Sequence, residues 1–233
     1  MIPLRDDVPS RSAPIVTVML LAVNVAAFVY QFSLGTTESV ARGAVHPAEA
    51  FVFEFGLVPC RLTGACAVDF PPPVVTIFTS MFLHGGLFHI GGNMLYLWIF
   101  GDNVEDTLGH GRFLVFYLGC GIAAALGQTL VDPDSQVPMI GASGAVSGVL
   151  GAYLLLFPYA TILTLVTFGF FIKFVHIPAV IVLGLWIVVQ FANGFLTLGA
   201  IAGGGIAWFA HIGGFVAGLA LVLVLRPRLR RHA

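Results

Sequence analysis

Long apolar runs alternate with short polar segments along the whole chain. Six runs are candidates to cross a lipid bilayer: Pro14–Leu34, Phe78–Phe100, Phe113–Val131, Gly141–Phe157, Ile177–Phe191 and Gly205–Leu225. A helix of about 20 apolar residues spans a hydrocarbon core roughly 30 Å thick, and most of the runs approach that length. The pattern predicts an all-α membrane protein with a bundle of six transmembrane helices.

Two stretches between these runs do not fit a simple crossing. Residues 35–78 are rich in proline, which indicates a long external loop between the first and second helices with a short interfacial helix at His46–Phe55. Cys60 and Cys66 lie in this loop, and they either form a local disulfide or stay as free thiols. Residues 159–176 are apolar but interrupted by threonines, Gly169 and Lys173, a pattern compatible with an interfacial hairpin.

Composition supports the membrane assignment. Hydrophobic residues make up 58% of the 233 residues, charged residues make up 9%, and the mean hydropathy is +1.00. Soluble domains carry about 25% charged residues, so the expected surroundings are the lipid bilayer. The formal net charge of −1 gives no indication of nucleic-acid binding.

The positive charges predict an orientation, because Lys and Arg concentrate in cytoplasmic segments. Most of the 10 cationic residues fall on the side of the termini, and only Arg42 and Arg61 fall opposite; the terminal set is Arg5, Arg11, Arg112, Lys173, Arg226, Arg228, Arg230 and Arg231. The N-terminus shows neither a cleavable signal nor an Arg/Ser-rich presequence, which favours a prokaryotic plasma membrane. We therefore expect a cytoplasmic segment at 1–13, a six-helix domain at 14–225 and a basic cytoplasmic tail at 226–233.

Two polar residues interrupt the fourth and sixth runs at the same depth. Ser143 lies 14 residues before Phe157, and His211 lies 14 residues before Leu225. Each is therefore about 21 Å from the cytoplasmic boundary, well inside the hydrocarbon core. Polar side chains at such depth mark functional sites in membrane proteins.

Small residues accompany both positions. Gly144 and Gly148 in the fourth run, like Gly214 and Gly218 in the sixth, have the spacing that lets helix backbones pack closely. Such packing would bring the hydroxyl and the imidazole within hydrogen-bonding reach. The run Gly141–Phe157 is short, about 25 Å, so its first turn is expected below the outer surface, where unpaired amides can stabilise an anion.

The second run carries two further polar side chains on one helix face. His89 and Asn93 are four residues apart, and with the Ser143 amide they predict an oxyanion hole. His84 points about 140° away from His89 and is a less direct participant. No acidic residue lies in the fourth or sixth run to orient the histidine, so the sequence predicts a Ser-His dyad. We expect neither a metal nor a cofactor.

The chain resembles the rhomboid family of intramembrane serine proteases in three motifs: Gly141-Ala142-Ser143-Gly144, Ala210-His211-x-x-Gly214-x-x-x-Gly218 and His89-x-x-x-Asn93. The resemblance covers the whole six-helix core. It implies that Ser143 is the nucleophile and His211 the general base, while His89, Asn93 and the Ser143 amide bind the oxyanion. It also implies transmembrane protein substrates with a locally unstable helix end and small residues near the cleaved bond.

This sequence departs from the family at several points. The Trp-Arg pair that many members carry in the external loop is not evident, and Ser147 stands where a tyrosine often packs on the histidine. Gly92 occupies a position that is bulky in some members. Trp186 and Phe191 in the fifth run are either substrate-gate residues or lipid-facing aromatics.

Three other functions fit parts of the sequence. A catalytically silent relative that binds membrane clients would normally lack Ser143 or His211, and both are present. A transporter would use intramembrane polar residues as a pathway, but no inverted repeat of hydropathy is visible. A metal site of His84, His89 and His211 lacks adjacent cysteine or carboxylate ligands.

Overall fold

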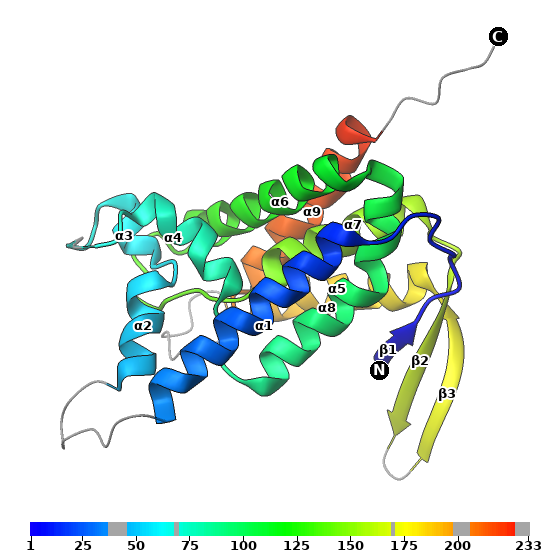
Figure 1. Ribbon diagram of the computed structural model, residues 1–233, viewed down its shortest axis with the longest axis horizontal. Coiled ribbons are helices and arrows are strands. Elements are labelled where there is room, and N and C mark those ends of the chain that lie inside the picture. The colour runs from blue at the N-terminus through cyan, green and yellow to red at the C-terminus, as the bar shows by residue number, and fades with distance from the viewer. Residues whose placement is uncertain (37–45, 68–69, 169–170, 198–205, 227–233) are drawn as a thin grey trace.

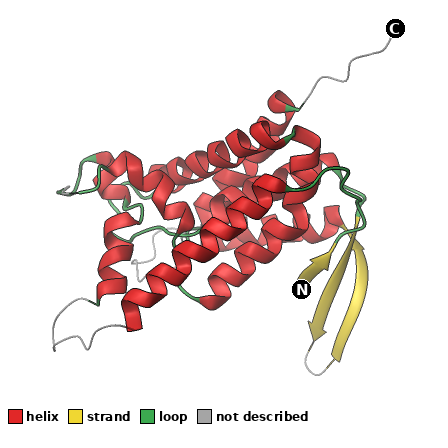
Figure 2. Ribbon diagram, in the orientation of Figure 1, coloured by secondary structure: helices red, strands yellow, loops and turns green. Residues whose placement is uncertain are grey.

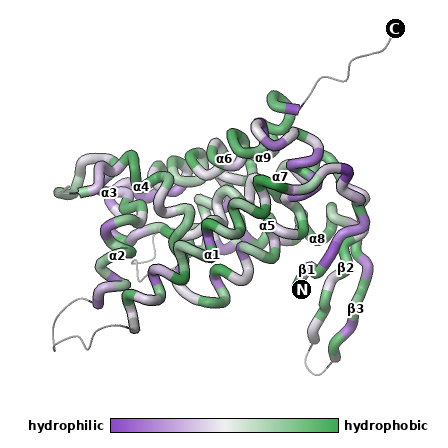
Figure 3. Tube along the Cα trace, in the orientation of Figure 1, coloured by the Kyte–Doolittle hydropathy of each residue, from purple (hydrophilic) through white to green (hydrophobic). Residues whose placement is uncertain are grey.

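The structure, a computed structural model of the chain, describes residues 1–36, 46–67, 70–168, 171–197 and 206–226. Most of these residues are helical, and a small sheet lies at one end of the helical bundle (Figures 1 and 2). The longer helices are α1 (Ile15–Thr36), α5 (Leu87–Leu108), α6 (His110–Val131), α7 (Ser143–Leu156), α8 (Ala179–Leu196) and α9 (Trp208–Leu225). Hydrophobic residues run along all of them (Figure 3).

Several of the described helices can cross a membrane by length and composition. Helices α1, α6, α8 and α9 each meet that test alone. Helix α5 meets it together with α4 (Pro73–Thr79) and the 3-10 turn η1 (Ser80–Phe82), a pair that is bent by 83°. The chain is therefore an integral membrane protein with several spans.

The second membrane run does not begin where the sequence predicts. A continuous helix from Phe78 is wrong, because Phe78 belongs to α4 and the chain breaks before α5 begins at Leu87. Gly85 and Gly86 follow His84 at the break. The Gln31 side chain of α1 forms two hydrogen bonds with the His84 backbone. Its Nε2 donates to the His84 carbonyl oxygen at 2.8 Å, and the His84 N–H donates to its Oε1 at 3.2 Å. These bonds satisfy polar groups that the break leaves without helical partners.

Helix α7 lies inside the bundle, in contact with α5, α6 and α9 (Figure 1). Its residues from Gly144 to Tyr153 are all buried. Its 14 residues rise only about 21 Å, less than the thickness of a hydrocarbon core. A helix surrounded by protein need not match the length of one that faces lipid, which is compatible with its short span.

The sheet pairs three antiparallel strands in the order β1 (Ile2–Arg5), β2 (Thr161–Phe168) and β3 (Phe171–Pro178). The hairpin expected at residues 159–176 is confirmed. Strand β1 is not predicted by the sequence, because a four-residue strand with a proline has no readable alternation. The sheet adds a β element to the fold that the all-α prediction omits.

Polar contacts tie the N-terminal residues to the same end of the bundle. The buried Glu105 carboxylate accepts hydrogen bonds from the N–H groups of Val16 and Thr17 at 2.9 and 2.8 Å. Asp6 accepts a hydrogen bond from the Tyr153 hydroxyl at 2.6 Å. Burial raises the pKa of the Asp6 carboxyl above its ordinary value, although the bond from Tyr153 opposes this shift. The N-terminal segment is thus packed against α5 and α7.

The described residues between α1 and α5, 46–67 and 70–86, form short helices and turns. Helix α2 (Pro47–Phe55) confirms the short helix expected from His46, and α3 (Pro59–Thr63) follows it. Cys60 and Cys66 form a disulfide, which resolves the two alternatives for these thiols. Some sequence predictions fall outside the described residues: Arg42, Gly205 at the start of the sixth run, and the tail from Pro227 with Arg228, Arg230 and Arg231.

Candidate active site

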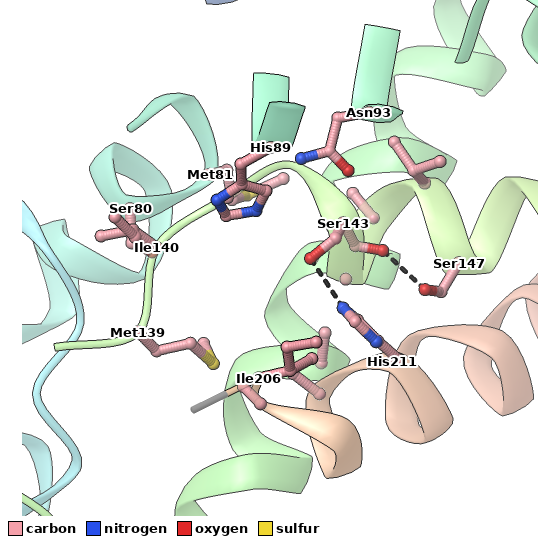
Figure 4. A pocket seen from close by; sticks show the side chains of 18 of the residues that line it. Ser80, Met81, His89, Asn93, Met139, Ile140, Ser143, Ser147, Ile206 and His211 are labelled. Carbon is pink, nitrogen blue, oxygen red and sulfur yellow. Dashed lines mark hydrogen bonds between the residues drawn. The ribbon is translucent and has the colours of Figure 1, made fainter. Parts of the chain in front are cut away.

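A cavity of about 630 Å³ opens between α5, α7, α8 and α9. The segment 138–141, which leads into α7, forms one wall of it. The predicted site residues His89, Asn93, Ser143 and His211 all line this cavity (Figure 4). Segments far apart in the sequence therefore contribute polar groups to one hollow.

Ser143 and His211 form a direct hydrogen bond. The Ser143 Oγ lies 2.8 Å from His211 Nε2 (Figure 4). Ser143 is the first residue of α7, so its amide belongs to the turn whose N–H groups have no helical acceptor. The arrangement joins a hydroxyl, a proton acceptor and the positive end of a helix.

Gly141 separates Ser143 from His89. Its φ of +121° lies in the region that favours glycine, and its N–H donates to the Ser80 carbonyl oxygen at 2.9 Å. A β-carbon on Gly141 would come within 2.6 Å of His89 Nε2 and 3.5 Å of Ser143 Oγ. The missing side chain therefore leaves open the space between the imidazole and the hydroxyl.

The geometry assigns a proton to His89 Nε2. The N–H of Gly85 donates to His89 Nδ1 at 3.2 Å, so Nδ1 is an acceptor. A neutral imidazole that accepts at one nitrogen carries its proton on the other. His89 Nε2 can consequently donate a hydrogen bond into the space that a side chain at Gly141 would fill, next to Ser143 Oγ.

Asn93 supplies a second donor nearby. Its side chain is buried, and its Nδ2 has no partner among the described residues. Figure 4 shows Asn93 next to His89, with its amide nitrogen on the side of His89. Burying an amide N–H without a partner costs free energy, and an acceptor atom of a bound ligand would offset that cost.

The glycine faces bring the two helices of the site together. A β-carbon on Gly214 would overlap the Gly144 carbonyl oxygen, and one on Gly218 would overlap that of Gly148. The predicted close approach of α7 and α9 at these four glycines is thus present in the structure.

Residues without a firm sequence assignment also have clear positions. The buried Ser147 donates from Oγ to the Ser143 carbonyl oxygen at 2.6 Å. His84 is buried with its ring against His89, at a centroid distance of 5.1 Å. Trp186 lines the cavity with its ring 5.9 Å from that of His211, whereas Phe191 packs on Phe195.

Sequence reasoning missed one residue that touches the site. Gln190 Oε1 lies 2.8 Å from His211 Nδ1. The available signal was a lone glutamine near the end of the apolar fifth run, because a polar side chain in a membrane span needs a partner. In the described part of the chain, no three His, Cys, Asp or Glu side chains come together as a metal site.

Comparisons with known proteins agree on one family. The model of the Rhomboid domain matches residues 71–228. Rhomboid protein 1, mitochondrial, of Saccharomyces cerevisiae is 31% identical over 156 residues, which cover 65% of this chain and 42% of that protein. RHOMBOID-like protein 5 of Arabidopsis thaliana is 33% identical over 154 residues, covering 65% and 45%.

A bacterial relative matches a shorter segment. Rhomboid protease GluP of Bacillus subtilis is 42% identical over 78 residues, which cover 34% of this chain and 15% of that protein. The chain thus spans less than half the length of each of these three relatives.

Proposed function

The chain belongs to the rhomboid family, and from this membership and the Ser143–His211 pair we propose that it is an intramembrane serine endopeptidase. The observation that carries the proposal is the 2.8 Å contact between hydroxyl and imidazole inside a cavity with an unpartnered amide. Ser143 is the nucleophile, and His211 is the general base.

The reaction is acyl transfer to Ser143 followed by hydrolysis. His211 Nε2 removes the hydroxyl proton as Oγ attacks a peptide carbonyl carbon. The peptide C–N bond then breaks, and Nε2 returns the proton to the leaving amine. Water attacks the acyl-enzyme in the same manner and frees the serine. No metal or cofactor takes part in these steps.

The negative charge on the carbonyl oxygen is held by three donors. We assign this role to His89 Nε2, Asn93 Nδ2 and the Ser143 amide. His89 Nε2 lies next to Gly141, the buried Asn93 Nδ2 has no partner among the described residues, and Ser143 begins α7. Donors fixed in advance and shielded from water stabilise such a charge strongly.

We further propose that α5, with its bent entry, and α7 complete a set of six spans with both termini in the cytoplasm. The domain then extends over 14–225, with cytoplasmic segments at 1–13 and 226–233, in a prokaryotic plasma membrane. The positive charges support this orientation. The substrates are transmembrane proteins, because the cavity lies among helices that are long and apolar enough to span a bilayer. The substrate must be unwound at the cleaved bond, because a helix shields its own peptide bonds.

Cleavage of a model substrate tests the proposal. Purified protein in micelles is incubated with a single-span substrate protein, and the products are identified by mass spectrometry. We expect cleavage within or next to the span, and loss of cleavage in Ser143→Ala. A Ser143→Ala variant as active as the original would overturn the assignment of the nucleophile.

A further inference from the structure

Gln190 of α8 contacts the histidine of the site from the side opposite to the serine. Its side chain is buried, with 5% of its surface exposed. His211 Nδ1 lies 2.8 Å from Gln190 Oε1, while Nε2 faces Ser143. Among the residues described, no other side chain bonds to Nδ1.

The orientation of the Gln190 amide is set by its own helix. Nε2 of Gln190 donates to the Trp186 carbonyl oxygen at 3.2 Å. A carbonyl oxygen can only accept, so the amide nitrogen must face it, and Oε1 must face His211. Because Oε1 also can only accept, His211 Nδ1 must carry a proton.

This proton location determines what Nε2 can do. A neutral imidazole with its proton on Nδ1 has a free electron pair on Nε2, which is the nitrogen next to Ser143 Oγ. The other tautomer would present an N–H to the serine and could not accept its proton. Gln190 thus selects the form of His211 that can act as a base.

The rings around His211 restrict its other movements. Trp186 lies at a centroid distance of 5.9 Å and Trp208 at 6.2 Å. Neither ring offers a hydrogen-bond acceptor, so they limit the position of the imidazole without choosing its tautomer. The acceptor comes from Gln190 alone in the described structure.

We infer that Gln190 is a positioning residue that fixes the tautomer and orientation of His211. It also accepts from Nδ1–H while Nε2 holds the serine proton, so it stabilises the imidazolium intermediate. The inference rests on the proposed function, and it adds a third member to the Ser-His pair from a helix that neither motif includes.

A purely structural role for Gln190 predicts different behaviour. Asn193 offers a matched control, because its Nδ2 donates to the Val189 carbonyl oxygen of the same helix at 2.9 Å. It therefore makes the same kind of bond to its own helix, without the contact to His211. If Gln190 served only to make this bond to its own helix, Gln190→Leu and Asn193→Leu should have similar effects.

The test compares Gln190→Leu, Gln190→Glu and Asn193→Leu in the full chain. We expect Gln190→Leu to lower kcat at least about tenfold while KM stays within about twofold. Gln190→Glu, which keeps an acceptor, should restore most of kcat, and Asn193→Leu should resemble the original protein. An unchanged kcat in Gln190→Leu, or a loss that glutamate does not rescue, would overturn the inference.

A second readout does not depend on how the variants fold. Histidine 15N chemical shifts of the unmodified protein in micelles distinguish a proton on Nδ1 from one on Nε2. We expect His211 to carry it on Nδ1, and a proton on Nε2 contradicts the inference. Failure of the proposed function is seen separately, either as no cleavage by the original protein or as undiminished cleavage by Ser143→Ala.

Discussion

Gly214 of α9 lies directly against the carbonyl group of Gly144 of α7, with no room for a side chain between the two backbones. Gly144 follows Ser143 in the chain, and Gly214 stands three residues after His211. The contact therefore sets the distance between hydroxyl and imidazole. A change of one methyl group at this point should affect both stability and catalysis.

We expect Gly214→Ala to destabilise the protein by about 1–3 kcal/mol, because the helices must separate to admit the new β-carbon. Thermal unfolding in micelles measures this loss. Gly184→Ala on α8 is the control, since a β-carbon there meets nothing within 4 Å. The control should unfold no earlier than the original protein, because alanine favours a helix over glycine by about 1 kcal/mol. Equal effects of the two changes would contradict the account.

Gly141→Ala should reduce activity while leaving the bundle folded. Its positive φ strains any other residue, and the added β-carbon would displace His89 from the space beside Ser143. Loss of one oxyanion donor lowers kcat by about 10²–10³-fold. Gly92→Ala is the matched control, because Gly92 lines the same cavity and a β-carbon there has open space. Equal kcat values for the two variants would contradict the view that the missing side chain at Gly141 keeps the oxyanion space open.

His89→Ala and Asn93→Ala should each lower kcat by about 10²–10³-fold with little change in KM. Both side chains bind a charge that is present only in the transition state, so they add little to substrate affinity. Steady-state kinetics with the model substrate separates the two parameters. A raised KM at constant kcat would show instead that these residues bind the ground state.

The double variant of His89 and Asn93 gives a further check on this site. Residues that hold one charge together are coupled, so the combined loss should be smaller than the product of the single losses. Strictly multiplicative losses would indicate that the two side chains act on separate steps.

Asp6→Asn should make stability less dependent on pH. Because burial raises the folded pKa of Asp6 above its ordinary value, the folded state binds more protons than the unfolded state between the two pKa values. Stability from this group is full below the ordinary pKa and is lost as the pH rises through the folded pKa. The variant should therefore gain most over the original protein at about pH 7 and least at about pH 4. Thermal unfolding across this interval measures the difference, and a gain that is largest in acid would contradict the assignment.

The sequence predicts much of the fold because hydropathy alone identifies spanning helices. The runs that became α1, α6, α8 and α9 are predominantly apolar, and each helix begins within three residues and ends within five residues of its predicted limits. The break before α5 was not predicted, because the bonds that Gln31 makes to the His84 backbone are long-range. Strand β1 is not predicted for the same reason, because it forms only by pairing with β2, which lies far along the chain.

The site was predictable to the extent that its chemistry stands out against an apolar background. Ser143 and His211 were paired by counting helical rise, and the structure brings them together. The sequence does not predict the role of Gln190, because a neutral glutamine on a helix outside the three motifs does not resemble the acidic partner of a catalytic histidine. A neutral amide from a third helix makes the contact instead, and only the packing of α8 on α9 brings it there.

Reaction with a fluorophosphonate probe, followed by peptide mapping, tests the central claim most directly. Such probes label a serine only when a base activates its hydroxyl. The account predicts label on Ser143, abolished in His211→Ala. Label on Ser147 or Ser80 instead, or undiminished label on Ser143 in His211→Ala, would contradict it.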